Sequence, residues 1–132
     1  MTKDKKSPVK MFVYGTLMPR YWNHDYFLKG NTLSEKKASV GGELWIYSQL
    51  PMLVESKSKR VNGYLVELKH SWQLVAIDKL ETGYDKRTIS VTVDGESKKQ
   101  DAIAYMFSME DAARIGAIPS NRESYYDIVS NI

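Results

Sequence analysis

The chain has 132 residues, enough for one domain with a single hydrophobic core, and it contains no cysteine. The lack of cysteine excludes disulfides, thiolate zinc sites and cysteine nucleophiles, and it is typical of a reducing compartment. Nineteen basic and sixteen acidic residues give a net charge of only +3, and no basic face with interleaved aromatic residues emerges, which argues against a nucleic-acid-binding protein.

We expect a single domain over residues 1–132, with residues 1–9 as a flexible basic tail. No stretch approaches the roughly 18 apolar residues of a membrane span. The first residues also lack the apolar core of a signal peptide. The sequence therefore predicts a soluble cytoplasmic protein that contacts neither nucleic acid nor membranes, and it leaves the oligomeric state open.

The run from Met11 to Tyr14 predicts a buried strand, because its aromatic and β-branched residues suit a pleated surface. It passes into a loop that begins at Gly15 and ends at Pro19. Gly15 has no Cβ, so main-chain amides there can approach a ligand closely. Such a loop can hold a carboxylate or an oxyanion, although a strand followed by a glycine is most often only a turn.

Periodicity and turn residues predict the remaining elements in chain order. Asn23 is expected to cap a short helix that stops at Gly30, and Ser71 to cap a longer helix that stops at Thr82-Gly83. A short helix is expected over 109–115, and a C-terminal segment over 119–131. Five further strands are expected, over 38–48, within 50–54, and over 60–68, 86–93 and 101–108. The first is expected to have a bulge or bend at its double glycine, and the last two to be joined by a hairpin turn over 94–99. Since strands outnumber helices, we expect an α+β fold in which a mixed, mainly antiparallel sheet closes into a small barrel.

Two carboxylates of the longer helix, Asp78 and Glu81, stand out. Trp72, Val75, Ala76 and Leu80 are expected to form its apolar stripe, with Leu74, Ile77, Asp78 and Glu81 as the adjoining line. Glu81 lies close to two turns after Leu74, so it extends a line that is otherwise apolar. Burial and a helix C-terminus both raise a carboxyl pKa, which would make Glu81 a useful base. A solvent-facing acidic edge is the alternative.

The other chemistry-bearing residues give weaker signals. His24 and His70 have no acid at metal-ligand spacing, so we expect no metal site, and His24 is expected to bond a nearby loop. Tyr105, on a late strand, either bonds a substrate or belongs to the core. The sequence has no nucleophile turn, phosphate loop or dinucleotide fingerprint.

Two separated motifs resemble one known family. Val13-Tyr14-Gly15-Thr16-Leu17 with Asn23-His24 resembles the VYGTL…NH opening of the γ-glutamylcyclotransferase-like superfamily, particularly its AIG2-like and γ-glutamylamine cyclotransferase branches. Ile77-Asp78-Lys79-Leu80-Glu81 with Gly83-Tyr84 resembles its LDxLEGY segment. Softer matches in the same order are found at 50–54, 61–65 and 102–105.

The resemblance implies a small mixed barrel with flanking helices and an enzyme that needs no cofactor or metal. Its substrate would be a small γ-glutamyl amine or γ-glutamyl amino acid, converted to 5-oxoproline and a free amine. Glu81 would be the general acid/base, and the loop of Tyr14, Gly15, Thr16 and Leu17 would bind the glutamyl end, with Tyr84 and Tyr105 as further substrate-binding residues. A non-catalytic domain of the same fold that binds small molecules is the alternative.

The chain departs from the family pattern at three places. Thr82 lies between Glu81 and the glycine of the motif. Lys86 aligns with a family arginine, but if Arg87 is the counterpart, the loop after Glu81 is threaded differently and Tyr84 loses its assigned place. Met18-Pro19-Arg20 replaces a more usual basic, glycine-containing run, so the rim that selects the leaving amine is expected to differ.

Overall fold

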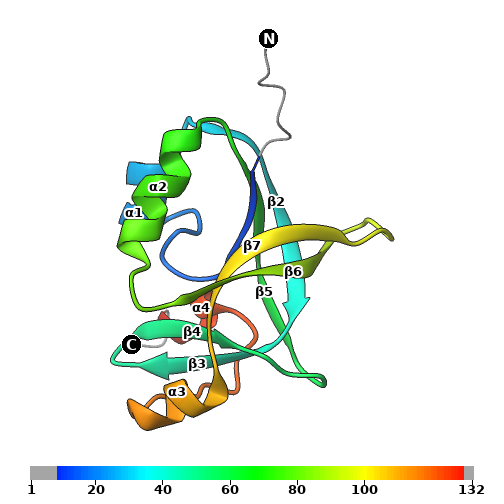
Figure 1. Ribbon diagram of the computed structural model, residues 1–132. Helices are drawn as coiled ribbons and strands as arrows, with labels where there is room; N and C mark the ends of the chain where they lie inside the picture. Colours follow the sequence, from blue (N-terminus) through cyan, green and yellow to red (C-terminus); the bar gives the residue numbers. More distant parts are fainter. Residues whose placement is uncertain (1–8, 130–132) are drawn as a thin grey trace.

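The computed structural model describes residues 9–129, in which eight strands form one mixed sheet. Five of them close into a barrel, because β1 pairs with β5 on one edge and with β7 on the other (Figure 1). The barrel strands are, in order, β1 (Lys10–Val13), β5 (Arg60–Leu68), β2 (Thr32–Gly41), β6 (Asp85–Val93) and β7 (Gln100–Phe107). Three strands extend the sheet beyond β7: β4 (Leu50–Val54), β3 (Glu43–Tyr47) and β8 (Ile118–Pro119). The expected α+β fold with a small, mainly antiparallel barrel is confirmed.

Short helices flank the barrel. Figure 1 shows α1 and α2 side by side along one flank, and α3 beside β3 and β4. The helices are α1 (Trp22–Phe27), α2 (Ser71–Leu80), α3 (Met109–Arg114) and α4 (Tyr125–Val129). Within the described residues no helix combines the length and the apolar character needed to cross a membrane.

Strand β7 changes partner along its length, and this positions the site. Its first half pairs in parallel with β1 at Met11 and Ile103. Its second half pairs in parallel with β4, where Leu53 lies opposite Met106. Tyr105 lies between the two pairings. Since β1 ends at Val13, the loop that follows leaves the sheet at the point where β4 takes over the β7 edge.

The core fills the barrel with large apolar side chains. Phe12, Leu53, Val61 and Ile77 are fully buried. The close packing of β1 on β5 depends on Gly63, because a Cβ at this position would lie 2.2 Å from the carbonyl oxygen of Val13. Burying a side chain of this size contributes about 1.5–3 kcal/mol, so packing of the barrel interior supplies much of the folding free energy.

The single continuous strand expected over 38–48 was wrong, although the bend expected at its double glycine is confirmed. The chain forms two strands here, β2 and β3, separated at Gly42, and β2 begins already at Thr32. The first half of β2 carries exposed polar residues and therefore lacks an apolar pattern, yet it is fixed by backbone pairing with β5. At Gly42 a Cβ would lie 2.6 Å from Leu53 Cδ1 and 3.2 Å from the carbonyl oxygen of Val54, so glycine allows the junction of β2 and β3 to approach β4 closely.

The apolar stripe expected on α2 was also wrong. The buried residues of α2 are Gln73 and Ile77, whereas Trp72, Val75 and Leu80 are at least 40% exposed. The Gln73 amide donates to the carbonyl oxygen of Phe27 at 2.9 Å and accepts from the N–H of His70 at 2.8 Å. Because its polar groups are paired, Gln73 is buried at low cost in free energy. The face of α2 that carries Gln73 and Ile77 therefore packs toward the interior.

Both expected helix caps differ in the structure. His70, in an extended conformation, is the N-cap of α2, and it forms a capping box with Gln73. Tyr21 is the N-cap of α1 and makes no side-chain cap hydrogen bond. Asn23, which was expected to be the cap, lies inside the first turn of the helix. Helix α1 ends at Phe27, before the predicted stop at Gly30, which has a φ of +79°.

The remaining elements agree with expectation to within one residue at most boundaries. The strands expected over 60–68, 86–93 and 101–108 and the helix over 109–115 correspond to β5, β6, β7 and α3. The C-terminal segment expected over 119–131 contains α4 and the end of β8, and its last residues lie outside the described part. The tail expected over 1–9 also lies outside it except for Val9, which packs against the core.

Candidate active site

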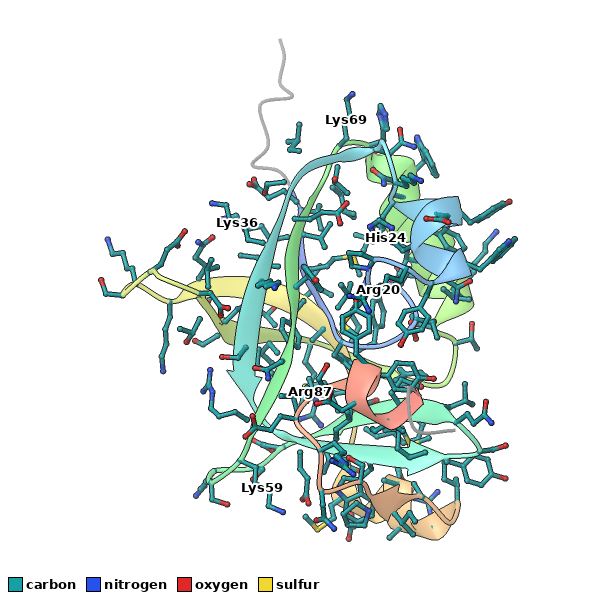
Figure 2. All side chains as sticks on the ribbon, turned by 180° about the vertical axis from the view of Figure 1, so that it is seen from behind. Arg20, His24, Lys36, Lys59, Lys69 and Arg87 are labelled. Carbon is teal, nitrogen blue, oxygen red and sulfur yellow. The ribbon has the colours of Figure 1, made fainter. Side chains whose placement is uncertain are left out.

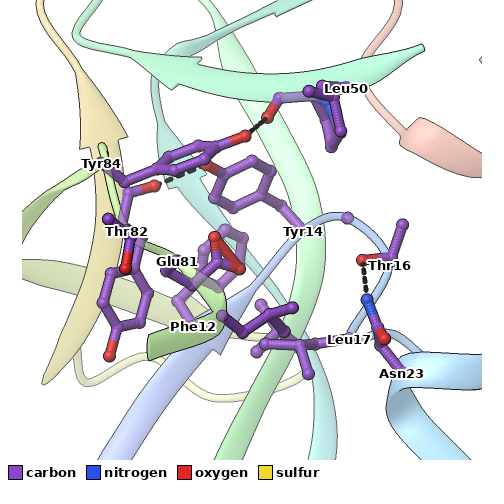
Figure 3. A pocket seen from close by; sticks show the side chains of 14 residues that line it. Phe12, Tyr14, Thr16, Leu17, Asn23, Leu50, Glu81, Thr82 and Tyr84 are labelled. Atoms are coloured by element: carbon purple, nitrogen blue, oxygen red, sulfur yellow. Dashed lines mark hydrogen bonds between the residues drawn. The ribbon is translucent and has the colours of Figure 1, made fainter. Parts of the chain in front are cut away.

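A cavity of about 250 Å³ lies between the loop after β1, the C-terminal end of α2 and the start of β4 (Figure 3). Every site residue predicted from the sequence lines it: Tyr14, Gly15, Thr16, Leu17, Glu81, Tyr84 and Tyr105. The structure thus brings together the loop after β1 and the carboxylate that follows α2, which lie far apart in the sequence.

Glu81 is held in place at the end of α2. It is the C-cap residue of the helix, and its main-chain N–H donates to the carbonyl oxygen of Ile77 at 2.9 Å. Its carboxylate points into the cavity and faces the loop after β1 (Figure 3). Burial raises the pKa of Glu81 from 4.5 to about 7. The carboxyl can therefore both accept and release a proton near neutral pH.

The loop from Gly15 to Leu17 lines the cavity and has main-chain N–H groups without an acceptor in the described part of the chain. The N–H of Met18 donates to the carbonyl oxygen of Gly15 at 3.0 Å, which closes a tight turn. Among residues 9–129, no hydrogen bond uses the N–H groups of Gly15, Thr16 or Leu17 as donors. Gly15 also packs on Pro51, whose Cγ would lie 2.6 Å from an added Cβ. Consecutive free N–H groups form a concavity that suits an anion.

Asn23 fixes the outer side of this loop. Its side-chain amide donates to Thr16 Oγ1 at 2.8 Å (Figure 3). The residue expected as a helix cap therefore connects α1 to the loop. This contact holds the Thr16 side chain at the rim of the cavity.

Three tyrosines form the cavity wall, and their hydroxyl protons are already bound by protein acceptors. Tyr14 donates to the carbonyl oxygen of Tyr105, and Tyr84 donates to that of Pro51 at 2.8 Å. Tyr105 donates to Asp78. Burial is the main cause that raises the pKa of each tyrosine well above its ordinary value. The tyrosines therefore stay neutral, which leaves Glu81 as the lining group that titrates near pH 7.

The structure separates the two carboxylates of α2. Asp78 does not line the cavity and accepts hydrogen bonds from Tyr105 and from Lys86, whose Nζ lies 3.0 Å from Oδ2. Burial alone would raise the pKa of Asp78, but these two hydrogen bonds outweigh it and hold the pKa below its ordinary value. Asp78 and Glu81 thus do not form a shared acidic edge.

The segment after Glu81 accommodates Thr82 without displacing the site. Thr82 Oγ1 donates to the carbonyl oxygen of Lys79 at 2.8 Å, and Gly83 takes a φ of +102°. Tyr84 then donates its N–H to the carbonyl oxygen of Glu81 at 3.0 Å and lines the cavity. Lys86, on β6, points toward α2 and forms an ion pair with Asp78, whereas Arg87 forms an ion pair with Asp85 at 3.6 Å.

Several lining residues were not assigned to the site from the sequence. They are Phe12, Val13, Asn23, Leu50, Pro51, Leu80 and Thr82. The 50–54 motif was a usable signal, since β4 borders the loop through Pro51. Leu50 and Leu80 are 52% and 40% exposed, so they give the mouth of the cavity an apolar part beside the exposed Thr82.

The histidines take no part in this site. His24 Nε2 lies 2.7 Å from Glu35 Oε1, so this histidine bonds strand β2 and not the nearby loop that was expected. His70 caps α2. In the described part of the chain no group of three or more histidine, aspartate or glutamate side chains is placed to hold a metal ion.

A family model described as gamma-glutamyl cyclotransferase, AIG2-like, matches residues 11–125. No curated protein matches the chain. The match spans every residue that lines the cavity.

Solved structures share the fold at low sequence identity. An AIG2-like protein from Mus musculus has a TM-score of 0.66 at 21% identity, over 77% of this chain and 78% of that one. YkqA from Bacillus subtilis has a TM-score of 0.63 at 22% identity over 76% of this chain, which spans only 36% of YkqA. The uropathogenic E. coli-specific protein c4763 has a TM-score of 0.70 at 13% identity, over 96% of this chain and 99% of that one.

Proposed function

The chain belongs to the gamma-glutamyl cyclotransferase, AIG2-like family, and from this premise we propose that it converts a γ-glutamyl amine or γ-glutamyl amino acid to 5-oxoproline and a free amine. One observation carries the proposal. A carboxyl with a pKa of about 7 lines the same cavity as a loop whose main-chain N–H groups have no acceptor within residues 9–129. No other group lining the cavity titrates near neutral pH.

The proposed reaction is an internal transfer that needs no water and no cofactor. The α-amine of the glutamyl group attacks its own γ-carbonyl carbon, so a C–N bond forms and closes the five-membered ring. The C–N bond to the leaving amine then breaks. Counted from the neutral α-amine, one proton leaves the attacking nitrogen and one reaches the leaving nitrogen, and Glu81 carries a proton between them. Because the attack is intramolecular, orientation alone supplies much of the rate.

The raised pKa of Glu81 supports its role as general acid/base. With reference pKa values of about 8 for an α-amine and about 4.3 for glutamate, proton transfer to an ordinary carboxylate is uphill by roughly 5 kcal/mol. Burial raises the pKa of Glu81 to about 7, which lowers this cost to about 1.4 kcal/mol. The same carboxyl can return the proton to the leaving amine.

The N–H groups of Gly15, Thr16 and Leu17 are proposed to hold the glutamyl end of the substrate. They suit either of two negatively charged groups: the substrate carboxylate, or the carbonyl oxygen as charge develops on it. Tyr14, Tyr84 and Tyr105 supply the walls that exclude water. The apolar part of the mouth, formed by Leu50 and Leu80, would receive the leaving amine.

The proposal is tested by incubating the protein with γ-glutamyl-ε-lysine and a panel of γ-glutamyl amino acids, and measuring 5-oxoproline by mass spectrometry. We expect product with at least one substrate and loss of product in Glu81→Gln. Glu55→Gln, an exposed carboxylate outside the cavity, is the matched control. Stabilisation of the protein by these compounds without product would instead indicate a binding domain that has lost turnover. Turnover that persists in Glu81→Gln would remove the assigned base.

A further inference from the structure

A second cavity, of about 310 Å³, lies on the other side of the loop that follows β1. It shares no lining residue with the candidate active site. The outer faces of β2 and β5 form its floor, and Arg20 and the start of α4 form its wall. Figure 2, seen from behind, shows Arg20 near α4.

Strand pairing explains which side chains reach this cavity. Lys37 on β2 lies directly opposite Tyr64 on β5. Since side chains alternate along a strand, Asn62 projects on the same face as Tyr64, while the intervening Gly63 faces the barrel interior. Two polar donors and one cation are thus gathered on the outer face of the barrel.

The segment leading into α4 is fixed over this face. Asn62 donates its main-chain N–H to the carbonyl oxygen of Glu123 at 2.7 Å. The hydroxyl of Tyr126 donates to the carbonyl oxygen of Pro19 at 2.6 Å. These contacts join β5, α4 and the loop, so the cavity is bounded by segments held to one another.

Arg20 is presented to the cavity in an unusual way. Its backbone is left-handed, with a φ of 87°, a conformation that costs a non-glycine residue of the order of 1–3 kcal/mol and is concentrated at functional sites. Its guanidinium carbon lies 4.9 Å from the centre of the Tyr126 ring. No hydrogen bond or ion pair among the described residues uses the Arg20 N–H groups, so they are available to an oxyanion while the ring holds the side chain in place.

The positive charges that line the cavity exceed the negative charge there. Among the residues that the structure describes, neither Arg20 nor Lys37 forms an ion pair. One carboxylate, Asp94, also lines the cavity, which leaves an excess of one positive charge. An anion would be attracted here, and Asp94 would accept a hydrogen bond from a hydroxyl group of the same molecule.

We propose that this cavity binds a small organic oxyanion that carries hydroxyl groups, with Arg20 and Lys37 contacting the oxyanion and Asp94 contacting a hydroxyl. Phosphate monoesters and hydroxy-carboxylates share this chemistry. The proposal is independent of the cyclotransferase activity, since it concerns other residues and is measured without turnover.

Glycerol 3-phosphate and glycerate are the two probes, because both carry hydroxyl groups but differ in the oxyanion. Each is titrated into the 132-residue protein, and the amide signals of Arg20, Lys37 and Asn62 are followed by NMR. Glycerol and sodium chloride at matched ionic strength are the controls. We expect saturable shifts with at least one probe, and which probe binds identifies the oxyanion. Shifts that sodium chloride reproduces, or none at all, would overturn the proposal.

Variants separate specific binding from general charge attraction. Arg20→Asn removes the charge and keeps a residue that tolerates left-handed backbone, and Lys37→Gln removes the second cation. Each change should weaken binding about tenfold, the factor that one charge-assisted hydrogen bond supplies. Lys36→Gln is the matched control, because Lys36 is the neighbouring strand position, on the opposite face, and pairs with Glu96. Equal weakening by all three changes would contradict the assignment, and signal dispersion reports whether each variant is folded.

Discussion

The Tyr14 hydroxyl donates a hydrogen bond to the main-chain carbonyl oxygen of Tyr105, at the position where β7 is between its pairings with β1 and β4. The tyrosine side chain thus satisfies a carbonyl in the gap between the two pairings. The same ring lines the candidate active site, so one residue contributes both to the sheet and to the cavity.

Replacing Tyr14 with phenylalanine should destabilise the protein by about 1–3 kcal/mol, because the carbonyl of Tyr105 is left without its partner in a buried environment. Urea unfolding measures the change. Tyr47→Phe is the control, since that ring is 43% exposed. Equal effects of the two changes would show that the Tyr14 hydroxyl has no special role in stability.

The pH dependence of turnover should report the ionisation of Glu81. Since burial raises the pKa of Glu81 to about 7, we expect kcat/KM to rise with pH through a limb centred near 7, below the limb that the substrate α-amine adds near its reference pKa of about 8. A limb centred near 4.5, the ordinary value for glutamate, would mean that another carboxyl controls the rate. The measurement is a rate profile between pH 4 and 9 on the best γ-glutamyl substrate.

Glu81 should also lower the stability of the fold at high pH. Below pH 4.5 both folded and unfolded states are protonated, and no penalty applies. Between pH 4.5 and about 7 the unfolded state loses its proton first, so stability falls as pH rises, and the full penalty persists above 7. Relative to its effect at pH 4, Glu81→Gln should therefore be more stabilising at pH 8, by at most about 3 kcal/mol.

Chemical unfolding at the two pH values tests this expectation, with Glu55→Gln as the control. A constant difference between Glu81→Gln and the parent protein at both pH values would show that the carboxyl is not perturbed in the folded state.

Gly15→Ala should reduce turnover, because the added Cβ would lie 2.6 Å from Pro51 Cγ and the loop must move away from the cavity. A displacement of about 1 Å at such a site costs about 100-fold in rate. The double variant Gly15→Ala, Pro51→Ala removes the clashing Cγ and should recover much of the activity. Gly41→Ala is the control, since its nearest neighbour would be at an ordinary 3.5 Å. A failure of the double variant to recover activity would argue against the steric explanation.

The inward face of α2 can be checked by stability alone. Ile77→Ala should cost about 2–5 kcal/mol because Ile77 is fully buried. Val75→Ala should cost less than about 1 kcal/mol, since Val75 is 59% exposed. Thermal or urea unfolding of the two variants shows whether the face of Ile77 packs inward, as in the structure, or the face of Val75, as the sequence pattern predicted. A larger effect at Val75 would contradict the structure of α2.

The sequence predicted the barrel class and most of the strands, because their alternation and turn residues are local signals. It also predicted the residues that meet at the candidate site, but through a resemblance of motifs. Nothing in the spacing of Gly15 and Glu81 indicates that they share a cavity. Only the partner change of β7, and the hydrogen bond from Asn23 to Thr16, bring the loop to that place.

The errors share one physical cause, which is that a distant partner overrode a local preference. Gln73 is polar and was not expected to be buried, yet Phe27 on α1 supplies the acceptor that makes its burial favourable. Asn23 has the character of a cap, but Thr16 captures its side chain. The first half of β2 forms a strand because its main chain pairs with β5, although its side-chain pattern does not predict a strand.

The closure between Met11 and Ile103 also has a consequence for how the protein folds. The loop that borders the cavity follows the first strand, but the hydrogen bond from Tyr14 to Tyr105 forms only when β7, near the other end of the sequence, has joined the barrel. Contacts of such large sequence separation form late and slow the folding reaction. We therefore expect the cavity to appear with the last cooperative step, so that a nascent chain lacking β7 can neither bind a γ-glutamyl compound nor be rescued by one.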